Sequence, residues 1–292
     1  MWTRSLQPAR DAAGLDTVLQ LTAIILLLRP FDVWWVAPFV LAAACLSLVV
    51  VGVRRSPITW LLLSALVAAR IVAVWPLADN HIYLLAYWCL AIGLALAAPA
   101  PAATLATSSR WLVGAAFAMA VLWKAVLSPD YVDGRFFRVA LLTDERFADA
   151  SLVLGGLSRN QMAENRTFLE PLPEGAELFH PPAFVDPPRL RAFAAIATWG
   201  GLVLEALIAL TFLIPAGGRI QVARHGSLLA FCATTYALAP VAGFGWLLAT
   251  MGLTQCGTDQ RVLRGTYVAV FILILMYTEI PWAGIVADWI AR

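Results

Sequence analysis

Long apolar runs, each near the length that crosses a bilayer as a helix, constrain this chain more than any other feature. A helix needs about 20 apolar residues to cross a hydrocarbon layer of roughly 30 Å. Runs of this length cannot be the short alternating strands of a transmembrane barrel. The sequence therefore predicts an all-α integral membrane protein with about eight transmembrane helices, at roughly 12–28, 34–53, 57–76, 82–101, 111–127, 192–215, 227–253 and 265–287. The first run is the weakest, because it is short, contains Asp16 and stops at Arg29.

The composition supports the same class. The 292 residues are 61% hydrophobic and 13% charged, whereas soluble chains carry roughly 25% charge. Much of the apolar surface must therefore face lipid, and we expect one transmembrane helical domain over 1–292. The net charge of +2 is too small to indicate a nucleic-acid partner. Tryptophans, which favour the headgroup layer, gather near the ends of the runs (Trp34, Trp35, Trp60, Trp75, Trp111, Trp123, Trp282, Trp289).

Arginines in the short loops predict the orientation. With the first run counted as a span, one side holds Arg4, Arg10, Arg54, Arg55, Arg110, Arg219, Arg224 and Arg292, and the other holds Arg29, Arg261 and Arg264. Cytoplasmic loops carry the excess of basic residues. We therefore expect a multi-pass protein of the cell inner (plasma) membrane with both termini in the cytoplasm.

The loop at 128–191, between the fifth and sixth predicted spans, has the character of a soluble protein. Its first half mixes apolar and charged residues at helical spacing, and its second half is rich in proline (Pro171, Pro173, Pro181, Pro182, Pro187, Pro188). This pattern favours one or two short interfacial helices followed by an extended strap. The arginine count places the loop outside the cytoplasm.

Ionisable residues inside apolar runs cost roughly 2.5–3.5 kcal/mol each on insertion scales, so each requires a reason. Arg70 and Glu205 both lie near the middle of their predicted spans and are the natural intramembrane ion pair. That pair could join two helices or belong to a substrate or proton site. Glu279, beside Pro281 and Trp282, fits a role at a helix end.

Lys124 is the one lysine among 20 basic residues, and it lies in an apolar run. Arginine does not deprotonate in proteins, whereas a desolvated lysine can act as a base. Because Lys124 lies about three residues from the outer end of its run, its ammonium could instead reach the interface without any chemistry. The two interpretations remain open at this stage.

Other polar residues are predicted at the same outer level as Lys124. His81 follows Asp79 and Asn80 in a turn between spans, where it could complete a hydrogen-bond network or line a site. His180 belongs to the same face, and His225 is expected as a solvated residue on the cytoplasmic side. The three histidines have no ligand spacing, and the four cysteines are scattered in or beside apolar runs, so we predict no metal site.

Two motifs resemble the membrane domain of the vitamin K-dependent γ-glutamyl carboxylases and of their bacterial relatives with a horizontally transferred transmembrane (HTTM) domain. The first reads Asn80-His81-Ile82-Tyr83-Leu84, and the second, after the helix end that carries Lys124, reads Asp130-Tyr131-Val132-Asp133-Gly134. The resemblance covers roughly residues 15–250. It implies a site at the outer face in which Asn80 and His81 hold the oxygens of a quinone and Lys124 is the catalytic base. The large soluble domain that binds the peptide substrate in true carboxylases has no counterpart here.

Three functions follow as hypotheses. The chain is expected to be a non-catalytic membrane subunit that docks in a larger assembly through the 128–191 loop and tryptophan-rich helix faces. The alternative is a quinone-binding membrane oxidoreductase, or a carboxylase-like enzyme, with Lys124 as base and His81 beside it. A transporter is a third reading, which the absence of an internal repeat makes less favourable.

Overall fold

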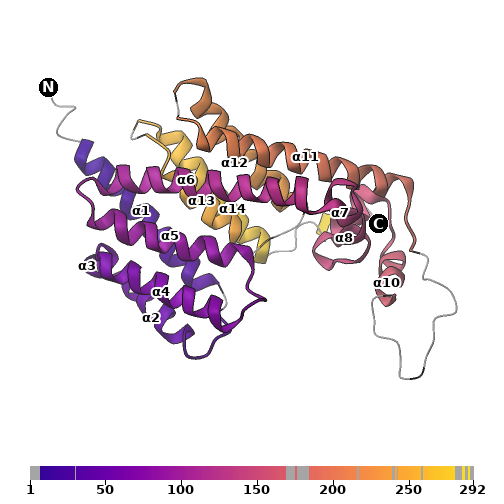
Figure 1. Ribbon diagram of the computed structural model, residues 1–292, viewed down its shortest axis with the longest axis horizontal. Helices are drawn as coiled ribbons and strands as arrows, with labels where there is room; N and C mark the ends of the chain where they lie inside the picture. Colours follow the sequence, from indigo (N-terminus) through magenta and orange to yellow (C-terminus); the bar gives the residue numbers. More distant parts are fainter. Residues whose placement is uncertain are drawn as a thin grey trace.

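The described part of the chain is helical throughout (Figure 1). The structure is a computed structural model that describes residues 7–29, 31–168, 175, 184–215, 217–238, 241, 243–257, 259–279, 285–286 and 289, without the side chains of 7–13, 278 and 279. Within these residues there is no strand. The long helices are α1 (Gln7–Leu28), α2 (Ala37–Val49), α4 (Pro57–Ala73), α5 (Asn80–Ala97), α6 (Pro101–Leu122), α11 (Pro188–Leu213), α12 (Arg219–Leu238), α13 (Phe244–Leu253) and α14 (Arg261–Glu279).

Among the described residues, three helices are long and apolar enough to cross a membrane: α5, α6 together with the π-helical turn η1 (Trp123–Leu127), and α11. Four shorter apolar helices accompany them, at Gly14–Leu28, Ala37–Val49, Pro57–Ala73 and Phe244–Leu253. This bears out the all-helical, membrane-like class that the apolar runs predict. The short helix α3 (Val51–Arg54) continues α2 after a break at Val50, whose backbone is extended.

The helices α4, α5 and α6 lie side by side, each antiparallel to the next (Figure 1). Half of the most apolar window of α5 is buried, and α5 packs against α4 on one side and α6 on the other. Trp60 and Trp88 are fully buried, and each satisfies its indole N–H inside the bundle. Trp60 donates to the Arg54 carbonyl at 2.7 Å, and Trp88 donates to the Thr22 hydroxyl at 3.0 Å. Most buried polar groups in proteins are paired in this way, whereas the indole N–H of Trp246 in α13 is buried without a hydrogen-bond partner among the described residues.

The predicted span 227–253 is not one helix: α12 ends at Leu238, and the short helix α13 begins at Phe244. Gly243 begins α13 with a positive φ of 85°, and a Cβ there would lie 2.6 Å from a guanidinium nitrogen of Arg29. The turn thus needs glycine both for its backbone and for the close approach of Arg29. A continuous apolar run hides this reversal, because the ten residues of α13 are as apolar as those of a continuous helix and nearly all are buried.

That extra reversal changes which ends of the bundle the helices reach. Gly14 of α1 lies against the Arg264 guanidinium near the start of α14, so α1 and α14 begin at the same end. α14 runs from there toward the other end of the bundle, parallel to α12: His225 near the start of α12 contacts Tyr267, and residues 232–237 of α12 face residues 270–277 of α14. Arg261 and Arg264 therefore lie at the end of the bundle where α1 begins.

The predicted loop folds into a compact cap, defined here as residues 129–167 together with the first two turns of α11. The cap contains α7 (Pro129–Val132), α8 (Arg135–Thr143), η2 (Glu145–Phe147), α9 (Ala148–Ala150), η3 (Ser151–Gly155) and α10 (Arg159–Thr167). Its core of Leu141, Leu142, Leu157 and Met162 closes on Leu190 and Ala194 of α11, separately from the bundle core. Most of the predicted proline strap lies outside the described residues.

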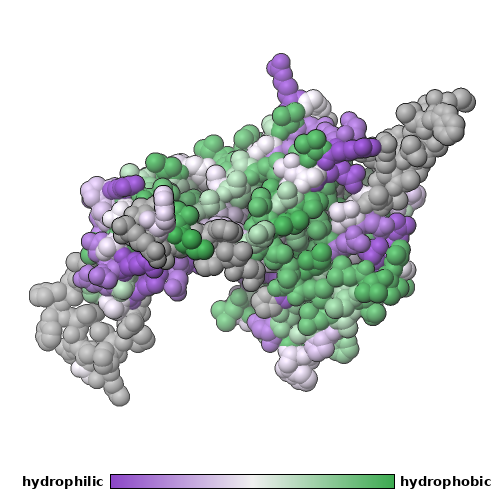
Figure 2. All heavy atoms as spheres, turned by 180° about the vertical axis from the view of Figure 1, so that it is seen from behind, coloured by the Kyte–Doolittle hydropathy of each residue, from purple (hydrophilic) through white to green (hydrophobic). Residues whose placement is uncertain are grey.

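Apolar side chains dominate the surface of the bundle. Figure 2 shows hydrophobic residues over much of the bundle face, with hydrophilic ones gathered over the cap and at the opposite end. Many of the exposed side chains are large, among them Phe39, Val49, Leu62, Val72, Met119, Val126, Ile196, Val203 and Leu273. Soluble monomers rarely expose so many large apolar side chains together.

The cap core generates a testable pair of variants on one helix. Leu142 of α8 is 3% exposed and Val139 is 49% exposed. Leu142→Ala should destabilise the cap by about 2–4 kcal/mol, since truncating a buried leucine leaves a cavity, whereas Val139→Ala should have little effect. Hydrogen exchange of α10 measures this, and equal protection of α10 in the two variants would contradict a separate cap core.

Candidate functional site

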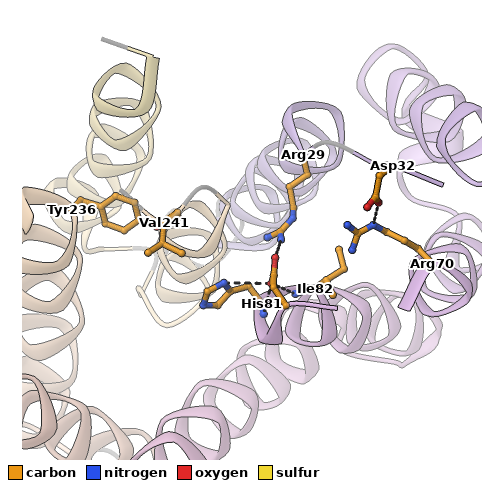
Figure 3. A network of polar contacts seen from close by, with 8 residues as sticks. Arg29, Asp32, Arg70, His81, Ile82, Tyr236 and Val241 are labelled. Atoms are coloured by element: carbon orange, nitrogen blue, oxygen red, sulfur yellow. Dashed lines mark hydrogen bonds and ion pairs between the residues drawn. The ribbon is translucent and has the colours of Figure 1, made fainter. Parts of the chain in front are cut away.

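The turn before α5 holds the first cluster of charged residues that sequence analysis singled out (Figure 3). Asp79 caps α5, because one of its oxygens accepts from the backbone N–H groups of His81, at 2.8 Å, and Ile82, at 3.2 Å. Its other oxygen accepts from the guanidinium of Arg29 at 2.6 Å. Arg29 ends α1 and its side chain is 9% exposed, so this ion pair ties the ends of α1 and α5 together.

The same cluster sets the protonation of Asp79. The His81 side chain, with Nδ1 3.4 Å from the carboxylate, and the positive charge of Arg29 hold the pKa of Asp79 well below its ordinary value, against the opposing effect of burial. The carboxylate is therefore charged throughout the physiological range. It acts as a fixed anion between Arg29 and His81.

His81 is also packed as an aromatic ring. It stacks on Phe244, the first residue of α13, with ring centroids 4.2 Å apart and planes inclined by 27°. Phe244 in turn lies near Phe117 of α6 and Phe231 of α12. His81 thus connects the N-terminus of α5 to the start of α13, a helix start that the sequence does not predict. Asn80 beside it is exposed on the first turn of α5.

Arg70 belongs to a neighbouring ion pair and not to the predicted one. Its Nε donates to Asp32 at 2.8 Å, while its Nη1 is buried without a hydrogen-bond partner among the described residues. Arg70 lies in the last turn of α4, not at mid-depth, because the helix ends at Ala73. The expected pair of Arg70 with Glu205 is not formed: α4 packs on α5 and α2, whereas α11, which carries Glu205, packs on α6 and α12.

Glu205 pairs with Lys124. The Lys124 ammonium lies 2.5 Å from one carboxylate oxygen, and the side chains are 26% and 9% exposed respectively. The second oxygen of Glu205 is buried without a hydrogen-bond partner among the described residues. The ammonium also lies 5.0 Å from the ring centroid of Tyr131 in the cap, a cation–π distance. Burial raises the pKa of Tyr131, so its hydroxyl remains neutral.

Lys124 and His81 therefore belong to different clusters. The rings of His81 and Phe117 both contact Phe244, so they lie at one level of the α5–α6 hairpin. Lys124 follows Phe117 by seven residues, about 10 Å farther along the helix at a rise of ~1.5 Å per residue. Each side chain has its own carboxylate partner and its own aromatic partner. The geometry does not join the two residues into one described site.

The remaining predicted polar residues have simpler outcomes. His225 is 4% exposed and its Nδ1 lies 2.9 Å from the Tyr267 hydroxyl, so the expectation of a solvated histidine is wrong. Its neighbour Arg224 is buried as well and donates to the carbonyls of Thr211 and Ile214, which have no helical partner at the C-terminal end of α11. His180 and the side chain of Glu279 lie outside the described residues.

The sequence patterns identify Arg70 and Lys124 as buried cations but do not identify the carboxylates that pair with the buried cations. Asp32 and Asp79 lie in loops, where carboxylates are common, and nothing in their spacing linked them to Arg70 and Arg29. Tyr131 was noticed only within a motif. All four cysteines are free thiols, and the described residues contain no group of three His, Cys, Asp or Glu side chains that could hold a metal ion.

Comparisons with known proteins add no relative: no family model, no curated protein and no solved structure matches this chain. The functional argument therefore depends on the geometry of the chain itself.

The Lys124–Glu205 pair predicts a pattern of stability changes. Lys124→Met should destabilise the protein by about 3 kcal/mol, because it leaves the buried Glu205 carboxylate unpaired. The double variant Lys124→Met/Glu205→Leu should recover most of that loss, since apolar replacement of a buried pair is often neutral. Thermal unfolding in detergent, followed by tryptophan fluorescence, compares them. A double variant less stable than the single one would contradict this role of the pair.

Asp79 predicts an acid-dependent contribution. Its folded-state pKa lies below the ordinary value near 3.8, so the unfolded chain takes up the proton first as pH falls. The stabilisation is thus fully present above about pH 5 and is lost progressively below about pH 4. The difference in unfolding temperature between the wild type and Asp79→Asn should be constant from neutral pH to about pH 5 and should shrink below it. A difference that grows on acidification would refute this.

Proposed function

We propose that this chain is a multi-pass protein of the inner membrane that serves as a non-catalytic subunit of a larger membrane assembly. Its bundle anchors it in lipid, and its cap, on the extracytoplasmic side, docks with a partner subunit. The proposal is built from the surface of the bundle, the distribution of arginines, the engagement of Lys124 and His81, and the exposed side chains of the cap.

The dimensions and charges of the bundle support the membrane part of this proposal. The 18 residues of α5 span about 27 Å at ~1.5 Å per residue, close to the thickness of the hydrocarbon layer. The corrected helix order gathers Arg54, Arg55, Arg219, Arg261 and Arg264 at or near the end of the bundle where α1 begins. A basic end of this kind favours the cytoplasmic side, which leaves the cap outside.

The main support for a non-catalytic role is that Lys124 and His81, on which catalysis would depend, are both held by other side chains. Lys124 is paired with Glu205 at 2.5 Å, and His81 is held between Asp79 and Phe244. An amine that acts as a base must be in its neutral form, whereas Lys124 takes part in an ion pair. The two clusters also lie at different levels of the hairpin. Both residues therefore serve helix packing.

The cap offers a surface for docking. Phe136 and Val139, three residues apart on α8 and hence neighbours on one face, are 52% and 49% exposed. They are flanked by Arg135 and Arg138, which are held by Asp133 and Asp186. An exposed apolar pair with ordered charges around it has the composition of a protein interface, in which aromatic residues and arginine are enriched.

Site-specific crosslinking in cells tests the docking. A benzoyl-phenylalanine at position 136 should give one discrete adduct with a different membrane protein, and the same probe at position 145 should not, because the Glu145 side chain is 89% exposed and polar. Phe136→Ser/Val139→Ser should abolish recovery of that partner. Equal adducts at both positions, or an adduct of twice the chain mass, would contradict docking with a partner of different sequence.

A quinone-binding oxidoreductase is the second candidate, and one observation favours it. The Lys124 side chain is 26% exposed beside a Glu205 oxygen that lacks a hydrogen-bond partner in the described chain, so a hydroxyl donor could complete the pair. Asn80 and His81 would then hold a quinone only after a rearrangement that brings the two clusters together.

Activity of the purified protein separates the two candidates. Quinone-dependent O₂ consumption that is lost in both Lys124→Ala and His81→Ala would establish the enzyme and overturn the subunit proposal. We expect no such activity in the wild type, and we expect both variants to retain the position-136 adduct.

A further inference from the structure

A pocket of about 380 Å³ opens between the outer parts of α12 and α14. Its α12 wall is formed by Cys232, Ala233, Tyr236 and Ala237, and its α14 wall by Val270, Leu273, Ile274, Met276 and Tyr277. A volume of this size is within the range of small-molecule sites. Except for the phenol and thiol groups, every lining side chain is a hydrocarbon or a thioether.

The void has a local cause in the sequence. Tyr236, which would otherwise fill the space, is turned toward α13, because its hydroxyl donates to the Val241 carbonyl at 2.5 Å and accepts from the Gly245 N–H. The next outward-facing positions on α12, Ala233 and Ala237, are too small to reach α14. The pocket is therefore a built feature of the turn between α12 and α13.

The pocket continues the apolar outer surface of the bundle at one end and approaches the cap at the other. Leu273 and Met276 are 62% and 43% exposed, so the mouth is continuous with the surface that lipid would cover. At the outer end, Tyr277 lies close enough to Asp149 of α9 to be affected by its charge, and α9 packs against α12. The site thus has an apolar length and one polar end.

We propose that this pocket binds one acyl chain of a membrane phospholipid, with the headgroup at the cap end beside Tyr277 and Asp149. The inference rests on the proposed membrane location. An amphiphile matches the site because hydrocarbon is favoured along the walls, while a polar headgroup can hydrogen-bond at the Tyr277 end. The bound chain would fill the space between α12 and α14 along the pocket.

Photolabelling tests the proposal. The purified protein is incubated in detergent with a limiting amount of phosphatidylcholine that carries a diazirine in one acyl chain, then irradiated and mapped by peptide mass spectrometry. Adducts should concentrate in 232–237 and 270–277 and should be displaced by unlabelled phosphatidylcholine. Ala237→Phe should reduce them about tenfold, because a ring overpacks the filled pocket, while Ala269→Phe, on an exposed position of α14 outside the pocket, should retain them.

A second filling variant and a folding control distinguish loss of lipid binding from loss of the folded structure. Ala237→Val, a smaller filling, should give an intermediate loss, and size-exclusion elution with circular dichroism shows that each variant is folded. Adducts spread over α6 and α11 in proportion to exposure, with no displacement by unlabelled lipid, would overturn the site while leaving the membrane proposal intact. Release of the protein from membranes by alkaline carbonate would instead overturn the proposed membrane location itself.

Discussion

The helices carry more apolar side chain than the fold can cover, and the rest of the structure follows from this excess. Buried residues such as Trp60, Trp88 and Leu85 fill the interior around α5, yet comparable side chains cover the outside of α2, α4, α6 and α11. In lipid, an exposed apolar surface has no free-energy cost, whereas an unpaired charge or an unpaired backbone polar group is costly. A helix surface that faces lipid can therefore carry many leucine and valine side chains, whereas an ionisable side chain there needs a partner.

The need to pair ionisable side chains explains where the buried charges lie. Three buried or half-buried cations each have a carboxylate partner from a different segment: Arg29 has Asp79, Arg70 has Asp32, and Lys124 has Glu205. The guanidinium of Arg224 donates to backbone carbonyls at the end of α11 and not to a carboxylate. These contacts lie at or near helix ends, where backbone groups also need partners. The same few residues thus neutralise charge and fix how neighbouring helices end.

Much of the fold could be predicted from the sequence, because apolar length is a strong signal. The runs at 57–76, 82–101 and 192–215 correspond to α4, α5 and α11 within a few residues. The turn inside 227–253 could not be found in this way, since α13 is buried throughout and its residues are as apolar as those of a continuous helix. The pairing of Arg70 with Glu205 failed for a related reason: depth along a run says nothing about which helices are neighbours.

Of the candidate site, the sequence identified the cations but not their surroundings. Lys124 was singled out because it is the one lysine, and that feature acquires a physical reason beside Glu205 and Tyr131. Arginine at this position would bring a larger planar group toward the Tyr131 ring, whereas lysine places a compact charge against one carboxylate oxygen. Its uniqueness fits a packing role as well as it fits catalysis.

The position of the Lys124–Glu205 pair shows what that packing role is. Glu205 lies on α11, whose first turns belong to the cap core through Leu190 and Ala194, and Lys124 lies in η1, which leads directly into α7. Tyr131 of α7 contacts the ammonium and approaches Gly201 of α11. The pair therefore fastens the two chain segments that leave the bundle and enter the cap. A cap held in this way keeps a fixed orientation over the bundle, which is what a docking surface requires and what a mobile lid over a reaction site would not have.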